Sequence, residues 1–339
     1  MKRNGILLRS TAFLLSLLSL LSLFGCNRKN EQKNRIFYEY FDTVSTVYDY
    51  SGGSEAAFNE NAAFVKMRLE YYHRLFDIYS EYDGINNIAT VNRLAGQSEV
   101  EVDKELIEFL EYAVEMHNLT DGHTNIAMGS VLSIWHKYRE IGEAVPTESE
   151  LKAAAEHTDI ENLVLDKENC TVRFLDPEMS LDVGAIAKGY AVERIAEELI
   201  SKGISSYVLD AGGNLRIIGT KPDGTTWRTG IQNPNPYAKE RYVYYLNVAD
   251  TSVVTSGDYQ RYYIVDGVKY HHIINKDTLM PADYFSSVTV VTKDSGLADA
   301  LSTALFNMDY EAGVELVSKL DDVSVVWLEK DGEIKKYGL

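Results

Sequence analysis

Apolar residues recur with helical spacing in several stretches of this chain. In residues 54–79, Ala, Phe, Met and Leu repeat with the period of a helix that has one buried face. The same pattern predicts further helices over residues 103–117, 127–139, 148–157 and 186–200, from residue 295, and over residues 311–320. Gly203 follows one of these helices, in the position that glycine favours just beyond a helix end.

Stretches rich in β-branched and aromatic residues lie between these helices. Residues 38–50 form the first, and Ser51-Gly52-Gly53 ends it. The other predicted strands cover residues 163–165, 172–175, 206–209 and 215–218, several segments between 227 and 272, and residues 288–291 and 323–327. Because helices and hairpins alternate without a regular strand–helix–strand repeat, the pattern predicts an α+β fold with mixed or antiparallel sheets and packed helices. We expect one globular unit of two lobes over residues 36–339.

The N-terminus carries the pattern of an exported lipoprotein. Basic residues precede an apolar run over residues 11–24, and the small residue Gly25 stands before Cys26. The run is shorter than the roughly 20 apolar residues that span a membrane. We therefore expect residues 1–25 to be a signal peptide and residues 26–35 a tether. A lipid on Cys26 would anchor the domain at the extracytoplasmic face of the cell membrane. An uncleaved anchor helix is the alternative, and it places the domain on the same side.

Composition excludes some classes of function. The formal net charge is −18, and nucleic-acid binding needs a basic surface, so we expect no nucleic-acid partner. An acidic protein that binds a phosphorylated ligand needs a local cation, which a divalent metal would supply. Cys170 is the only cysteine besides Cys26, so the sequence predicts neither an internal disulfide nor a cysteine metal site.

The helix predicted from residue 295 carries a candidate metal pair. Leu297 and Leu301 form its apolar stripe, while Asp299 and Thr303 are four positions apart and so share one helix face. A carboxylate and a hydroxyl are hard oxygen donors that could complete part of a magnesium shell. The alternative is that Asp299 is solvated and Thr303 bonds back to a helix carbonyl.

A second segment, residues 181–190, has the sequence LDVGAIAKGY. Small residues at a helix start let a ligand approach the backbone, free N–H groups there suit phosphate, and Lys188 adds a positive charge. The alternative is a capping Asp182 and a surface lysine. The glycine pair Gly212-Gly213, between two predicted strands, favours a tight turn, with close approach to a nucleotide as the alternative.

Two further features leave both a structural and a functional interpretation open. His272 ends a predicted strand, where a histidine can serve as a general base, although it can equally be a structural residue. Asp121-Gly122 follows a predicted helix and is typical of a turn. The common signatures of Rossmann, P-loop, zinc-protease and dithiol redox sites do not occur in the sequence.

Taken in this order, the segments resemble the ApbE family of FAD:protein FMN transferases. The resemblance extends from about residue 42 to residue 308. Its segments are Asp121-Gly122, residues 181–190, the Gly-Gly-Asn turn at 212–214, Trp227 with residues 230–234, residues 255–257, residues 270–274, and Asp299 with Thr303.

The resemblance implies a magnesium site and a catalytic base. The metal would be held by the backbone carbonyl of Ala185 and by the side chains of Asp299 and Thr303. His272 falls where the family places a candidate base, which would take the proton of the attacking hydroxyl. Magnesium would bridge the FAD diphosphate and neutralise the charge that builds up on the leaving AMP.

The resemblance also implies the substrate, its contacts and its partners. FAD is the expected substrate, and its implied contacts are Asp121, Asp182, Lys188 and Ile273. The family's acceptors are flavoprotein subunits of membrane electron-transport complexes such as Rnf or Nqr, or extracellular electron-transfer proteins. Two alternatives remain open: a magnesium-dependent FAD pyrophosphatase that releases FMN and AMP, and an FAD-binding lipoprotein without turnover. The FAD-binding lipoprotein would not need the Asp299–Thr303 pair.

Overall fold

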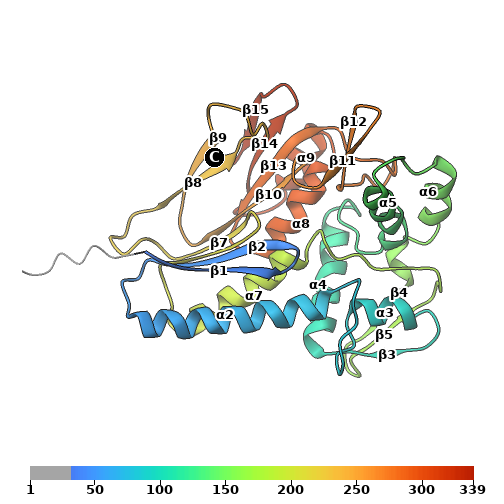
Figure 1. The fold of residues 1–339 in the computed structure, drawn as a ribbon, viewed down its shortest axis with the longest axis horizontal. Helices are drawn as coiled ribbons and strands as arrows, with labels where there is room; N and C mark the ends of the chain where they lie inside the picture. The colour runs from blue at the N-terminus through green and yellow to red at the C-terminus, as the bar shows by residue number, and fades with distance from the viewer. Residues whose placement is uncertain (1–31) are drawn as a thin grey trace, which may run out of the picture. The chain divides into compact units, whose positions relative to one another are not determined.

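An antiparallel sheet of eight strands forms the centre of the computed structural model, which describes residues 32–339 (Figure 1). Residues Lys33–Leu339 make one unit, and the predicted signal peptide and Cys26 lie outside the described residues. In sheet order the strands are β1 (Lys33–Tyr40), β2 (Thr43–Asp49), β6 (Tyr207–Ala211), β7 (Asn214–Ile218), β10 (Thr251–Gly257), β13 (Phe285–Thr292), β14 (Ser324–Glu329) and β15 (Ile334–Tyr337). Every neighbouring pair in this order is antiparallel, which confirms the α+β prediction.

Three smaller sheets and eight α-helices complete the part of the chain that the structure describes. The small sheets are β3 (Val100–Glu101) with β5 (Thr171–Phe174) and β4 (Leu163–Asp166), β8 (Trp227–Gln232) with β9 (Tyr242–Val248), and β11 (Tyr262–Val265) with β12 (Val268–His271). The helices are α2 (Glu55–Phe76), α3 (Ile88–Leu94), α4 (Lys104–Leu119), α5 (Gly129–Ile141), α6 (Glu148–Ala155), α7 (Ala187–Ser201), α8 (Ser295–Phe306) and α9 (Tyr310–Val317). No helix within residues 32–339 combines the length and apolar character that crossing a membrane requires.

The two faces of the central sheet are covered by different elements. Because side chains alternate along a strand, Val290 of β13 packs in the core under α8 and α9 while Val291 packs against the β8–β9 hairpin. Helices α2 and α7 cover the β2–β6 part of the first face, and Figure 1 shows α2 running beneath β1 and β2. Strand β13 is almost wholly buried for this reason, including the hydroxyl residues Ser287 and Thr289 between its apolar residues.

The single strand predicted over residues 38–50 is wrong. The structure has two strands, β1 and β2, joined by a turn at Phe41 and Asp42, whose φ angles are 56° and 49°. Two consecutive residues with positive φ make the tight hairpin turn that fits the twist of the paired strands. Glycine or asparagine usually marks such a turn, and neither is present here. Strand β1 also begins at Lys33, before the predicted domain start at residue 36.

Gly189 fixes the close crossing of α7 and α8. A Cβ atom at this position would clash with the backbone carbonyl oxygen of Ser295 and with Cβ of Asp299. Gly189→Ala is therefore expected to lower the free energy of unfolding by about 1–3 kcal/mol, because overpacking outweighs the better helix propensity of alanine. Urea denaturation of the full chain measures this effect. Glu197→Ala on the exposed side of α7 is the control and should shift it by only about 0.5 kcal/mol or less.

Candidate active site

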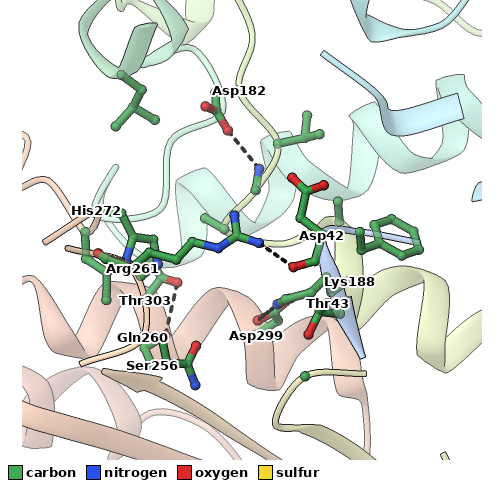
Figure 2. Close-up of a pocket in the computed structure, with 18 of the residues that line it drawn as sticks. Asp42, Thr43, Asp182, Lys188, Ser256, Gln260, Arg261, His272, Asp299 and Thr303 are labelled. Carbon is green, nitrogen blue, oxygen red and sulfur yellow. Dashed lines mark hydrogen bonds and ion pairs between the residues drawn. The ribbon is translucent and has the colours of Figure 1, made fainter. Parts of the chain in front are cut away.

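A cleft of about 950 Å³ opens beside the sheet, and most of the predicted site residues line it. Its walls come from the β1–β2 turn, the loop after α2, the start of α7, the end of β10, the residues after β12, and α8. The predicted site residues that line it are Asp182, Ala185, Lys188, His272, Ile273, Asp299 and Thr303. Segments that are far apart in the sequence therefore meet at one place (Figure 2).

Asp121 is the one predicted site residue that does not line this cleft. It lies beside a separate, shallower pocket of about 410 Å³, together with His117 and Lys276. Asn125 borders both pockets, so the two are neighbours. The expected contact between Asp121 and FAD stays a prediction.

Asp299 is held in the floor of the cleft by backbone and by charge. Its side chain lies on α8, whose first turn is capped by the side chain of Asp294, and only 4% of the residue is exposed. Oδ2 accepts a hydrogen bond of 2.8 Å from the Gly189 N–H, and Nζ of Lys188 lies 3.4 Å from both carboxylate oxygens. Burial raises the pKa of Asp299, while Lys188 acts in the opposite direction. The alternative of a solvated Asp299 is therefore wrong.

Thr303 lies one turn further along α8 and faces the same cleft. Its hydroxyl is 3.4 Å from Oγ of Ser256 on β10, whereas the helix carbonyl of Asp299 accepts from Ser302 instead. Within residues 32–339, no bond from the Thr303 hydroxyl to a helix carbonyl occurs, so the alternative of a back-bonded threonine is wrong. Figure 2 shows Ser256 and Thr303 joined across the cleft floor.

The start of α7 presents backbone groups to the cleft. The helix begins at Ala187 with no side-chain cap, and Gly184, Ala185 and Lys188 all border the cavity. Oδ1 of Asp182 accepts from the N–H of Gly184 at 2.9 Å, which shapes the turn that leads into the helix. The N–H groups of Ile186 and Ala187 bond the carbonyl of Val183, and that of Gly189 bonds Asp299, so it is the positive charge of Lys188 that makes this wall suit a phosphate.

His272 has one ring nitrogen free for chemistry. Its Nδ1 lies 3.2 Å from the carbonyl oxygen of Arg261 and must donate to it, which leaves Nε2 as an acceptor. Burial, followed by the positive charge of Arg261, lowers the pKa of His272 to about 3. The ring is therefore neutral at physiological pH. The neighbouring His271 is fully engaged, because Nε2 bonds the carbonyl of Ala282 and Nδ1 accepts from Ile273.

Sequence reasoning assigned no role to two arginines that line the cleft, Arg139 and Arg261. Nη2 of Arg261 donates to the backbone carbonyl of Asp42 at 3.1 Å, and Figure 2 shows its side chain reaching from the His272 side toward Asp42. In the described part of the chain, neither guanidinium lies within ion-pair distance of a carboxylate. Both therefore add positive charge that is available to a phosphorylated ligand. No sequence motif marks them as a pair, because they come from a helix and a loop that only the fold brings together.

The oxygen donors present fit magnesium better than a transition metal. Within residues 32–339, no group of three or more His, Cys, Asp or Glu side chains is placed to hold a metal ion. Magnesium commonly binds through one or two carboxylates and completes its shell with water and substrate phosphates. Asp299, Thr303 and Ala185 all border the cleft, and within residues 32–339 Lys188 is the one cation within ion-pair distance of the buried carboxylate, at 3.4 Å. A divalent cation at this position would be bound by that carboxylate together with the Thr303 hydroxyl.

Comparison with known proteins identifies close relatives over nearly the whole chain. The model of the ApbE family matches residues 43–327. An FAD:protein FMN transferase of Vibrio cholerae is 30% identical over 329 residues, which is 96% of each chain, and one of Treponema pallidum is 32% identical over 265 residues, covering 73% of this chain and 72% of its own. The crystal structure of the ApbE protein of Thermotoga maritima superposes with a TM-score of 0.80 at 28% identity, over 91% of this chain and 97% of that one.

Proposed function

The chain belongs to the ApbE family, and from this membership and the geometry of its cleft we propose that it transfers FMN from FAD to a hydroxyl group of an acceptor protein. The observation that carries this function is the pair Asp299 and Thr303, set on one face of α8 beside the uncapped start of α7. Oxygen donors suit a divalent cation, and the positive charge of Lys188 suits phosphate. The diphosphate of FAD requires both, and a cleft of about 950 Å³ accommodates a ligand of that class.

The reaction replaces one phosphorus–oxygen bond by another. A Ser or Thr hydroxyl oxygen of the acceptor attacks the phosphorus of the FMN half, the bond from that phosphorus to the bridging oxygen breaks, and AMP leaves with that oxygen. The hydroxyl proton passes to Nε2 of His272, which its Nδ1 bond to Arg261 leaves free to accept. Lys188 and the start of α7 bind the diphosphate, while Asp182 and Ile273 border the same ligand.

We propose that Mg²⁺ is held by Asp299, Thr303 and the backbone carbonyl of Ala185. When bound, the ion neutralises the negative charge that develops on the diphosphate as its central bond breaks. The chain supplies the Asp299 side chain for this purpose. The N–H of Gly189 and the ammonium of Lys188 oppose the rise in the pKa of this carboxyl that burial causes.

An FAD pyrophosphatase is the second candidate, because the same residues would serve with water as the nucleophile. Chromatographic measurement of AMP release by the full chain, with and without an acceptor, distinguishes the candidates. The transferase predicts AMP release that depends on the acceptor, with no matching rise in free FMN. Equal AMP and free FMN without an acceptor would instead identify a pyrophosphatase. Intact FAD under every condition would leave only a binding protein.

We also propose that the chain acts at the extracytoplasmic face of the membrane, with acceptors of the Rnf or Nqr type or extracellular electron-transfer proteins. The signal-like N-terminus that ends at Cys26 supports this location. A membrane-bound enzyme would meet such acceptors along the surface to which it is tethered.

Cys26→Ser is expected to release the protein from the membrane fraction. Serine keeps the size of the side chain but removes the thiol that would carry the lipid, and a single protein domain without its anchor has little affinity for the bilayer. Fractionation of cells that express the wild type or the variant measures this. Cys170→Ser is the matched control and should leave the distribution unchanged. Retention of the Cys26 variant in the membrane would instead indicate an uncleaved anchor helix.

A further inference from the structure

Three hydroxyl groups form a chain beneath the cleft. Oγ of Ser302 donates to the backbone carbonyl of Asp299 at 3.0 Å. Oγ of Ser302 also lies 2.8 Å from Oγ of Ser256, which in turn lies 3.4 Å from Oγ1 of Thr303. Ser302 is fully buried, Ser256 is partly buried at the end of β10, and Thr303 borders the cleft. The chain therefore runs from the protein interior to the ligand cavity.

The number of protons fixes the direction of these bonds, because each hydroxyl has only one proton to donate. Ser302 uses its proton on the carbonyl of Asp299, so the bond between the two serines must be donated by Ser256. The proton of Ser256 is then committed, so the contact with Thr303 must be donated by Thr303. This order is the one in which the carbonyl of Asp299 keeps its bond from Ser302.

This order determines what Thr303 offers to a ligand. With its proton directed at Ser256, the Thr303 oxygen has only lone pairs left for the cleft. A lone pair binds a cation, whereas a phosphate oxygen would need the proton. The carboxylate of Asp299, one turn away on the same helix, has the same preference.

We propose that Ser256 and Ser302 are positioning residues that hold the Thr303 hydroxyl with its proton turned away from the cleft, so that Thr303 presents a lone pair to a divalent cation. This inference rests on the proposed function, since that function places the cation between Asp299 and Thr303. Ser302 is buried behind the cleft, whereas Ser256 borders it. Both act through Thr303, in the way that residues behind the direct ligands orient those ligands in other metal sites.

Ser256→Ala tests the proposal because it removes the acceptor of the Thr303 proton. The affinity of the full chain for Mg²⁺, measured by titration calorimetry with saturating FAD and no acceptor, is expected to fall about 10–100-fold. FAD is recovered afterwards and checked to be intact. The Mg²⁺ concentration that gives half the maximal transfer rate should rise in parallel, while kcat at saturating Mg²⁺ changes little. FAD affinity in EDTA, followed by flavin fluorescence, should match that of the wild type.

Two further variants separate a positioning role from a loss of folding. Ser256→Thr keeps the hydroxyl on a strand residue and should restore Mg²⁺ affinity. Thr251→Val, on the same strand, removes a hydroxyl that bonds the carbonyl of Thr292 away from the cleft, and it should leave Mg²⁺ affinity unchanged. Ser302→Ala should weaken Mg²⁺ binding as Ser256→Ala does, because Ser256 can then turn its proton toward Thr303.

The outcomes distinguish this inference from the proposed metal site. Unchanged Mg²⁺ affinity in Ser256→Ala, or equal weakening in Ser256→Thr, would overturn the positioning role while leaving the metal site in place. A wild-type chain that binds no Mg²⁺ in the presence of FAD would overturn both. Weakening in Ser256→Ala with recovery in Ser256→Thr supports both.

Discussion

Asp299→Asn is expected to lower kcat for FMN transfer by about 10²–10³-fold, the size of effect seen when one preorganised electrostatic group is removed from a reacting centre. The amide oxygen of asparagine still accepts from the Gly189 N–H, so the crossing of α7 and α8 is kept. The negative charge that would bind Mg²⁺ is lost, and Lys188 loses its only ion-pair partner within residues 32–339.

The same substitution is expected to stabilise the fold at neutral pH. Burial raises the pKa of Asp299 above its ordinary value of 3.8, so the folded chain holds this proton more tightly than the unfolded chain does. Ionisation therefore destabilises the fold as the pH rises above 3.8. Asparagine does not ionise, so the advantage of Asp299→Asn in free energy of unfolding should grow from acid to neutral pH.

Steady-state kinetics and urea denaturation at two pH values measure these effects. Asp309→Asn is the matched control, because Asp309 caps α9 through the N–H of Ala312, away from the cleft, and asparagine caps a helix equally well. The control should keep both activity and stability. An Asp299→Asn variant that retains wild-type kcat would contradict a catalytic role for a metal bound by Asp299.

His272→Asn is expected to lower kcat by about 10²-fold, the low end of the usual contribution of a general base, because a ring whose pKa is lowered to about 3 is a weak base at neutral pH. The asparagine amide can still donate to the carbonyl of Arg261, as Nδ1 does now, but it has no counterpart of the basic Nε2. His157 bonds Asp176 outside the cleft, so His157→Asn is the control and should keep full activity. Equal activity in the two variants would transfer the role of base to a carboxylate or to the acceptor itself.

The pH dependence gives His272 an independent signature. Because burial and Arg261 lower its pKa to about 3, the rate should not fall between pH 8 and pH 5 through protonation of this ring. Arg261→Ala removes a positive charge and should raise the pKa toward its ordinary value of 6.5, so that an acid limb appears in the kcat/KM profile. NMR titration of the His272 ring measures the same shift directly. An acid limb near pH 6.5 in the wild type that His272→Asn removes would contradict the lowered pKa.

Local periodicity predicted the parts of the site that lie on one element. The helix from residue 295 is α8 (Ser295–Phe306), and its spacing placed Asp299 and Thr303 on one face without any knowledge of the fold. The segment over residues 181–190 likewise supplied the start of α7 through small residues that stand next to each other in the chain. Such features depend only on residues that are close together in the chain, so they can be predicted from the sequence.

Features that depend on distant segments could not be predicted in this way. The contact between Ser256 and Thr303 joins a strand to a helix, and only the packing of α8 on β10 creates it. The β1–β2 turn has positive φ at Phe41 and Asp42. Neither residue is a glycine, so the sequence does not indicate a turn there. Burial of Asp299 and the low pKa of His272 are also products of tertiary packing, so the sequence left their alternatives open.

The most direct measurement of the central claim is the intact mass of an acceptor domain, taken from an Rnf- or Nqr-type subunit, after incubation with the full chain, FAD and Mg²⁺. A second acceptor, with its target Thr replaced by Val, serves as the matched control. The account predicts that the first acceptor gains the mass of one FMN phosphoryl unit, that EDTA prevents the gain, and that the Val acceptor stays unmodified. Acceptor of unchanged mass in a mixture that has produced AMP and free FMN would contradict it.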